Sequence, residues 1–379
     1  MLLTPGQATV SQGVRSAMLR DLGEKDGEFQ ALVPEIRREL LAVSGLSQAE
    51  YDAVLFPGCG SAALEAVLGS AIPRTGRLLV AINGGGGRRI ARIGAALGVD
   101  TRRIEWPEQA PLEPGQIGLI LESDPAITHV AAVHCEASTG LLNPIGEIGR
   151  LAARHGRGLI VDASASLGGA PLGMESGAIQ FLTASSEGCL QGVPGAAFVL
   201  ARRTALEPCV GRARGFTFDL AAQWLSQSQT GRMRTAPPVQ VMLALHHCLR
   251  ELREEGGVPG RQARYAANTR TLLAGMSALG FEPLLPAPLR SHLVTAFRQP
   301  GHPCFQFDLF AALLQQQGFV LDPGDTHPGG YFRVAAIGDL YPEDFERFTR
   351  AAHGILTSMG VDWARPAATA VPSDTMVRG

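Results

Sequence analysis

Three parts of the sequence carry groups that could hold a small charged molecule. Residues 58–61 form a glycine-rich turn before an apolar helical stretch, where free backbone N–H groups and the helix dipole favour an anion. Asp162 ends an apolar, strand-like run, so its buried carboxylate could pair with a cation. Arg333 carries a forked guanidinium that suits a carboxylate or a phosphonate. These residue types predict a site for a small molecule.

Thiols and an imidazole suggest a different chemistry. Cys59 would lie at the start of the first of these helices, a position that suits a thiol nucleophile, and Cys189 and His134 could face the same cavity. Small buried cysteines are common in protein cores, so inert packing is the alternative. Glu187 is either an acid or base within the site or a solvated loop residue.

Lysine is almost absent from this chain. Lys25 is the only one among 379 residues, and it lies in the polar stretch 23–27. Chemistry that needs an amine side chain therefore has a single candidate. The cysteines show no paired close spacing, which predicts reduced thiols rather than a disulfide scaffold, and no metal site.

Composition argues against several classes of function. Charged residues make up 18% of the chain and the formal net charge is -2, which provides no field for nucleic acid or an acidic membrane. The apolar runs are strand-sized, far short of the ~20 residues of a membrane span. The first six residues lack the pattern of a secretory signal. We therefore expect a cytoplasmic protein with a small-molecule substrate.

The order of helical and strand-like patterns predicts an α/β fold. An amphipathic stretch at 29–43 precedes the apolar run 53–56, and strand-then-helix pairs recur as far as residue 184. Helices between nearly continuous apolar strands are typical of a mostly parallel sheet covered on both faces. In such sheets ligands bind at the carboxyl ends of the strands. The polar segments that follow the strands are residues 59–61, 83–87, 134–140, 162 and 185–189.

A change of pattern near residue 237 predicts a second domain, because long helical segments there give way to mixed strands and helices. We predict an N-terminal arm at 1–15, a large domain at 16–250 and a smaller α/β domain at 251–361. Residues 362–379 have no periodic apolar face and are predicted to be a disordered tail.

Seven motifs occur in order over roughly the first 360 residues. The motifs are Leu3-Thr4-Pro5-Gly6, Gly58-Cys59-Gly60-Ser61 with the helix after it, Asn83-Gly84, His134-Cys135-Glu136-Ala137-Ser138-Thr139-Gly140, Ile160-Val161-Asp162-Ala163, Cys189-Leu190-Gln191-Gly192-Val193-Pro194-Gly195, and Phe332-Arg333 with Ile337-Gly338. Together they resemble the motifs of the 2-aminoethylphosphonate:pyruvate aminotransferases and their alanine:glyoxylate aminotransferase relatives. The resemblance implies the fold-type-I architecture of pyridoxal-phosphate (PLP) aminotransferases. That architecture has a mostly parallel seven-stranded sheet in the large domain and a smaller C-terminal α/β domain.

The resemblance also assigns roles to residues. It implies cofactor contacts from Cys59, Gly60, Ser61, Gly86, Ser138, Asp162 and Thr235, and substrate contacts from Arg333, Thr4 and Gly6. In this family the carboxylate at the position of Asp162 keeps the ring nitrogen protonated. The alternatives are that Asp162 caps a loop and that Arg333 forms a structural salt bridge.

Five positions depart from the family's pattern, and the first concerns the Schiff-base lysine. That position is Gly188, preceded by Glu187 where an amide is expected. The ring that stacks on the cofactor is replaced by Gly86, in a four-glycine run that we interpret as a flexible loop.

The other departures remove hydroxyl groups. Ala137 replaces a hydroxyl residue, Cys59 replaces the serine of the phosphate loop, and Ala236 replaces a threonine that crosses from the neighbouring subunit. Thr235 is adjacent, so a shift of one residue could restore that hydroxyl. Five changes around one ligand favour a pocket that no longer holds the ligand in the usual way.

Two hypotheses follow. In the first, the chain is a transaminase-like enzyme on a small phosphonate or an amino or keto acid, with lysine-independent chemistry that uses pyridoxamine phosphate (PMP) or no cofactor. PLP or PMP would then bind non-covalently, if at all. The candidate catalytic positions are Glu187, Gly188 (the lysine equivalent), His134 and Cys59.

In the second hypothesis the chain is a catalytically inactive partner subunit that completes the site of a lysine-bearing paralogue. The family's active sites lie at a dimer interface, so we expect a homodimer, or a heterodimer with an active paralogue. Ordinary aminotransfer is disfavoured, because Lys25 lies far along the chain from Gly188.

Overall fold

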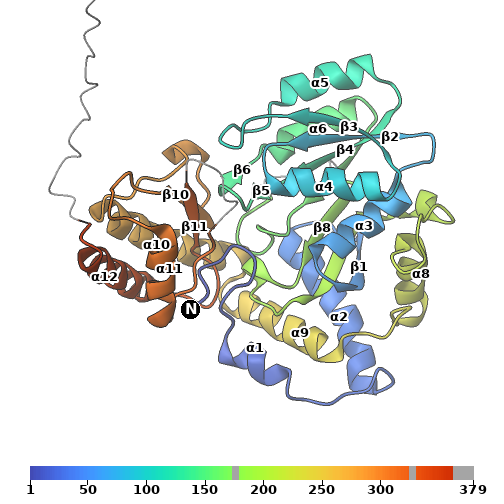
Figure 1. Ribbon diagram of the computed structural model, residues 1–379. Coiled ribbons are helices and arrows are strands. Elements are labelled where there is room, and N and C mark those ends of the chain that lie inside the picture. The colour runs from blue at the N-terminus through green and yellow to red at the C-terminus, as the bar shows by residue number, and fades with distance from the viewer. Residues whose placement is uncertain (173–178, 324–329, 362–379) are drawn as a thin grey trace, which may run out of the picture.

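The computed structural model describes residues 1–172, 179–323 and 330–361. The tail predicted at 362–379 lies outside the described residues. Figure 1 shows two lobes: a large one built on a sheet with helices on both faces, and a smaller one that contains β10, β11, α10, α11 and α12.

The sheet of the large lobe has seven strands in the order β1-β9-β8-β7-β4-β2-β3. The strand β9 runs antiparallel to the other six, which are parallel to one another, and this confirms the mostly parallel α/β sheet expected from the sequence. The strands are β1 (Tyr51–Gly58), β2 (Arg77–Ile82), β3 (Asp100–Glu105), β4 (Ile127–Val133), β7 (Gly158–Asp162), β8 (Phe181–Ser185) and β9 (Gly195–Arg202).

Alternate strand residues face two separate apolar cores, because successive side chains of a strand point to opposite faces of the sheet. In β1, Ala53 and Leu55 join one core with helices α2, α5, α6 and α9, whereas Val54 and Phe56 join the other with α3, α4 and α8. The strand β3 lies at the edge of the sheet, and its charged side chains are partly exposed. The helices are α1 (Gln12–Ala17), α2 (Gly27–Ser44), α3 (Gly60–Ala71), α4 (Gly85–Ala96), α5 (Pro114–Ser123), α6 (Ile145–Arg154), α7 (Arg203–Leu206), α8 (Leu220–Thr230) and α9 (Val239–Glu254).

The smaller lobe is held together by phenylalanine side chains. The antiparallel strands β10 (Val294–Arg298) and β11 (Tyr331–Ala335) pack with α10 (Gly257–Ala278), α11 (Phe307–Gln316) and α12 (Pro342–Ser358). The ring of Phe332 lies 5.5 Å from that of Phe281 and 5.3 Å from that of Phe307. Leu3 is buried in the same core, so the first residues of the chain pack on this lobe.

Short elements complete the fold. A two-stranded ribbon of β5 (Cys135–Glu136) and β6 (Leu141–Leu142) follows β4, and the 3-10 turn η1 (Gly188–Leu190) precedes β9. Two further 3-10 turns are η2 (Glu207–Cys209) and η3 (Ala287–Leu289).

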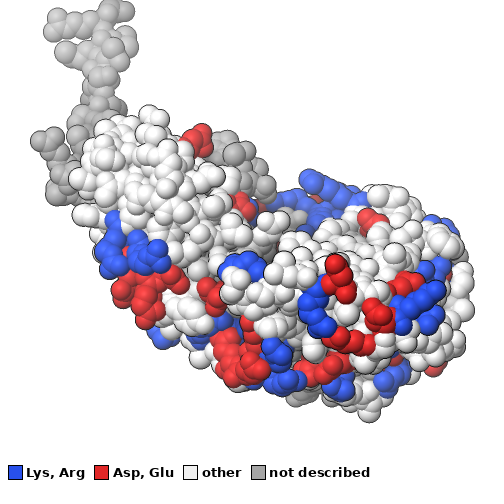
Figure 2. All heavy atoms as spheres, turned by 90° about the horizontal axis from the view of Figure 1, so that it is seen from below, with Lys and Arg blue, Asp and Glu red and all other residues white. Residues whose placement is uncertain are grey.

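Charged side chains of both signs lie on the face of the molecule that Figure 2 shows. On the face shown in Figure 2, acidic and basic side chains are interspersed, as the net charge of -2 leads one to expect. In the described part of the chain, no helix is both long and apolar enough to cross a bilayer. Nor do three His, Cys, Asp or Glu side chains gather anywhere in the described residues in a way that could hold a metal ion.

Candidate functional site

A cavity of about 320 Å³ lies where the carboxyl ends of the central strands meet the smaller lobe. Its wall includes Val133 from the end of β4, Asp162 from the end of β7 and Ser185 from the end of β8. The N-terminal segment contributes Gly6, and β11 contributes Arg333. The cavity therefore occupies the position at which open α/β sheets bind ligands.

Asp162 is at the base of this pocket and is 1% exposed. Its Oδ1 accepts hydrogen bonds from the backbone N–H and the hydroxyl of Ser164, at 3.0 and 2.6 Å. Its Oδ2 accepts a hydrogen bond from Nη2 of Arg89 at 2.7 Å. The carboxylate in turn raises the pKa of the Arg89 guanidinium above its ordinary value. Asp162 is thus an engaged carboxylate with an internal counterion.

The sequence reasoning missed Arg89. It lies on α4, three residues after Gly86, and residues three apart lie on the same face of a helix. This spacing was available in the sequence as a signal that Arg89 faces the same way as the glycine at the ring-stacking position.

The four-glycine run is not a flexible loop, because residues 85–87 form the first turn of α4. The backbone N–H groups of Gly86 and Gly87 each donate a hydrogen bond of 3.0 Å to the carboxylate of Glu136. Glu136 is 1% exposed, and burial raises its pKa above the ordinary value. A Cβ at Gly84 would lie 2.5 Å from the carboxyl carbon of Glu136, so the close approach requires glycine there.

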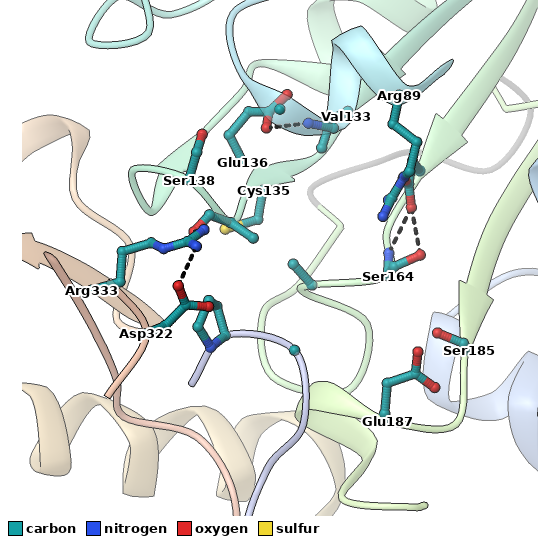
Figure 3. Close-up of a pocket in the computed structure, with 17 residues that line it drawn as sticks. Arg89, Val133, Cys135, Glu136, Ser138, Ser164, Ser185, Glu187, Asp322 and Arg333 are labelled. Carbon is teal, nitrogen blue, oxygen red and sulfur yellow. Dashed lines mark hydrogen bonds and ion pairs between the residues drawn. The ribbon is translucent and has the colours of Figure 1, made fainter. Parts of the chain in front are cut away.

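Glu187 and Ser185 form another part of the wall. Figure 3 shows both on the side of the pocket opposite to Arg333. The Oγ atom of Ser185 and the Oε2 atom of Glu187 are buried, and neither has a hydrogen-bond partner among the residues that the structure describes. Glu187 thus contributes to the pocket wall rather than to an outer loop.

Gly188 follows Glu187 but does not itself contribute to the pocket wall. Its φ of +75° lies in the left-handed region, and a Cβ there would be 3.2 Å from the carbonyl oxygen of Ser164. The backbone at the lysine-equivalent position therefore has a conformation that suits glycine.

Arg333 forms the salt bridge considered from its sequence and also lines the pocket. Its Nη2 pairs with Oδ1 of Asp322 at 2.6 Å, and its Nη1 donates to the carbonyl oxygen of Ala137 at 3.2 Å. Its Nε is buried and has no partner within the described chain, as is also true of the Oγ atom of Ser138. Both residues line the pocket.

Four other candidate residues lie beside the pocket. Cys59, Gly60 and Ser61 are at the start of α3, where a Cβ on Gly60 would approach the hydroxyls of Ser164 and Ser185 to 2.6 and 3.5 Å. Gly60 therefore packs directly behind the wall, whereas the Cys59 side chain is exposed. Thr4 turns away to donate a hydrogen bond to the carbonyl oxygen of Gln7.

The remaining candidates do not line the cavity. The His134 ring is buried with its Nδ1 2.9 Å from the hydroxyl of Ser166, and desolvation lowers its pKa to about 4. The thiol of Cys189 donates to the carbonyl oxygen of Ala165, and burial raises its pKa. Thr235 lies in the segment before α9 and is not part of the pocket wall. Neither His134 nor Cys189 contributes to the pocket wall.

Comparisons with known proteins identify the family. The class-V aminotransferase family matches residues 10–328. The 2-aminoethylphosphonate–pyruvate transaminase of Syntrophobacter fumaroxidans is 44% identical and covers 95% of this chain and 97% of its own. The 2-aminoethylphosphonate–pyruvate transaminase of Rhizobium meliloti is 41% identical and covers 98% of this chain and 97% of its own. The alanine–glyoxylate aminotransferase structure from Nostoc sp. superimposes with a TM-score of 0.87, at 24% identity and 94% coverage of both chains. The chain belongs to the class-V aminotransferase family.

Members of this family work with PLP, which alternates with PMP, so the pocket can be tested for its fit to that cofactor. No amine is available for a covalent bond, because Lys25 is the only lysine and is exposed outside the pocket. The carboxylate of Asp162 already accepts three hydrogen bonds, and Gly86 offers no ring for stacking. The residues present do not fit a PLP group bound in the manner of the family.

Proposed function

We propose that this chain binds a small phosphonate or an amino or keto acid in the pocket, and acts on it without a lysine Schiff base. The relatives named above are 2-aminoethylphosphonate–pyruvate transaminases, so an aminophosphonate is the first ligand to consider. The engaged carboxylate of Asp162 favours the form of this proposal that uses no cofactor over one that uses non-covalent PMP.

One observation carries the proposal. Four buried polar atoms without a partner among the described residues belong to side chains that line this single cavity. A buried polar atom without a partner costs about 1–3 kcal/mol, so four of them around one cavity favour a ligand that supplies the missing hydrogen bonds. The atoms are Ser138 Oγ, Ser185 Oγ, Glu187 Oε2 and Arg333 Nε.

The types of these atoms suit a molecule with an amine at one end and an acid at the other. Oε2 of Glu187 accepts hydrogen bonds, which an ammonium group can donate. Nε of Arg333 donates one, which a phosphonate or carboxylate oxygen can accept. Because the two side chains lie on opposite sides of the pocket, a short zwitterion would lie across it.

Glu187 would also move the proton. A carboxylate beside an ammonium can take a proton from its nitrogen, which leaves the neutral and nucleophilic amine. Arg333 would hold the acid end during this step, since its pair with Asp322 fixes the plane of the guanidinium. The hydroxyls of Ser185 and Ser138 can donate or accept and would adapt to either protonation state.

Calorimetric titration with three matched ligands tests the proposal: 2-aminoethylphosphonate, ethylphosphonate without the amine, and ethanolamine without the acid. We expect 2-aminoethylphosphonate to bind at least tenfold more tightly than either fragment. Glu187→Gln removes the negative charge, and Arg333→Lys removes Nε while retaining a cation near Asp322. Each should weaken binding at least tenfold, about 1.4 kcal/mol.

Glu24→Gln, at an exposed position near the N-terminus, is the control and should bind like the unaltered protein. Absence of binding by all three ligands, or equal binding by the Glu187→Gln variant, would contradict the proposal. Binding of 2-aminoethylphosphonate only after addition of PMP would instead support the cofactor-dependent form.

A further inference from the structure

Arg89 occupies the one position from which a side chain of α4 reaches the base of the pocket. Its Nη2 is 2.7 Å from Oδ2 of Asp162, a residue 73 positions further along the chain. Figure 3 shows the side chain extending from α4 towards Ser164, the other partner of that carboxylate. The three groups form one connected cluster.

The glycine at position 86 makes this contact feasible. Residues 86 and 89 are neighbours on one face of α4, so a large side chain at 86 would lie beside the path of Arg89. Glycine at 86 places no side chain beside that path.

The space beside Gly86 is already occupied from the other side. A Cβ at position 86 would lie 2.9 Å from Cγ2 of Val133 and 3.2 Å from Oε2 of Glu136. Glu136 is held there by the N–H groups of Gly86 and Gly87. An aromatic side chain at this position would have to displace a hydrogen-bonded carboxylate.

The charges at the base of the pocket are consistent with this packing. A carboxylate that is 1% exposed needs a cationic or hydrogen-bonding partner, and Asp162 has Arg89 and Ser164. Arginine does not lose its proton in proteins. A protonated pyridine ring at this carboxylate would therefore place a second positive charge beside the first, or would have to expel the Arg89 side chain.

We infer that Arg89 is the built-in counterion of Asp162 and thereby a specificity-determining residue that excludes ligands with a protonated pyridine ring, PLP and PMP among them. The carboxylate at the position that keeps the ring nitrogen protonated elsewhere in the family is retained here to fix an arginine. The inference concerns which ligands the pocket rejects, and it does not depend on the aminophosphonate being the ligand.

Equilibrium dialysis with PMP, which needs no lysine, tests this inference. Arg89→Met removes the cation and leaves Asp162 free to pair with the ring nitrogen, so we expect the affinity for PMP to rise at least tenfold over that of the unaltered protein. The gain should disappear in the double variant that also carries Asp162→Asn. Arg92→Met, an exposed position on the same helix, is the matched control and should not alter the affinity.

Unchanged or weaker PMP binding by Arg89→Met would overturn the inference, as would a gain that persists in the double variant. Thermal denaturation reports whether each variant is folded. If Arg89→Met does not fold, Arg89→Gln replaces it, since glutamine keeps hydrogen-bond donors without the charge. Its affinity for PMP should then exceed that of the unaltered protein. Failure of 2-aminoethylphosphonate to bind would leave this test unaffected, so the two proposals fail separately.

Discussion

A Cβ on Gly188 would lie 3.2 Å from the carbonyl oxygen of Ser164, the residue whose hydroxyl and N–H group hold Asp162. The lysine-equivalent position is thus packed against the segment that positions the carboxylate at the base of the pocket. Its φ of +75° adds a backbone conformation that non-glycine residues rarely adopt. The backbone at position 188 therefore does not readily accept a lysine.

We predict that Gly188→Lys will not restore a functional cofactor site. The left-handed backbone should cost about 1–2 kcal/mol of unfolding free energy, and Gly188→Ala should show the same loss without an amine. After incubation with PLP and borohydride, we expect no stoichiometric adduct at residue 188 by mass spectrometry. Efficient labelling of that lysine, with transamination of 2-aminoethylphosphonate and pyruvate, would contradict the prediction.

A second prediction concerns the buried carboxyl of Glu136. Burial raises its pKa in the folded protein, so its contribution to stability is present below the ordinary value of 4.5 and is lost as pH rises through the folded-state pKa. Glu136→Gln does not ionise. We therefore expect the unfolding free energy of the variant, relative to the unaltered protein, to increase as pH rises from 4.5 to 7. Urea denaturation at several pH values measures this difference between the two unfolding free energies. A difference that does not change with pH would contradict the raised pKa of Glu136.

His134 should have the opposite pH dependence. Its pKa is lowered from 6.5 to about 4, so the neutral ring contributes stability above pH 6.5 that is lost as pH falls through about 4. The shift corresponds to roughly 3 kcal/mol. His134→Asn should remove this part of the acid sensitivity between pH 6.5 and 4.

His353→Asn, at an exposed position of α12, is the control. Its unfolding free energy should depend on pH between 6.5 and 4 as steeply as that of the unaltered protein. If His134 had a catalytic role, activity would depend on pH with a bell-shaped profile that changes when this residue is replaced. We expect His134→Asn to change stability and not the pH profile of ligand binding.

The fourth prediction is that this chain self-associates through an exposed aromatic ring. Phe216 is 83% exposed, and the guanidinium of Arg234 lies 4.9 Å from its ring centre. Arg234 belongs to the segment 232–238 that, by its resemblance to the family, is expected to reach a neighbouring subunit. A large exposed ring beside that segment suits a contact between chains.

We therefore expect a dimer at micromolar concentration by light scattering, and weaker association in Phe216→Ser. Leu119→Ser changes another exposed apolar residue, on α5, and should leave the dimer intact. A monomeric unaltered protein would instead direct the search to a heterodimer with a lysine-bearing paralogue.

Much of the fold was predictable because it depends on local pattern. Near-continuous apolar runs such as β7 and β8 read as buried strands, and the structure buries every residue of both. The first of the long helical segments expected after residue 237 is α9, Val239–Glu254. In the same way, the absence of a lysine at position 188 is a property of the sequence alone.

The contents of the pocket were decided by the tertiary structure. The pair of Arg89 with Asp162 joins residues 73 positions apart, and the bonds of Glu136 to the glycine run span about 50. Such contacts exist only because the strand order places the carboxyl ends of β4, β7 and β8 side by side next to α4. Because the sequence alone does not give this strand order, it led to the prediction that the glycine run is a flexible loop.

The directions of the side chains that follow β4 were also decided by the tertiary structure. His134 and Glu136 belong to one motif, yet the first faces Ser166 in the core and the second faces α4 beside the pocket. The sequence by itself determined the α/β fold, the family and the glycine at position 188, because these depend on residue identity and local periodicity. Only the tertiary structure decided which charges meet in the pocket, because that depends on how distant segments pack.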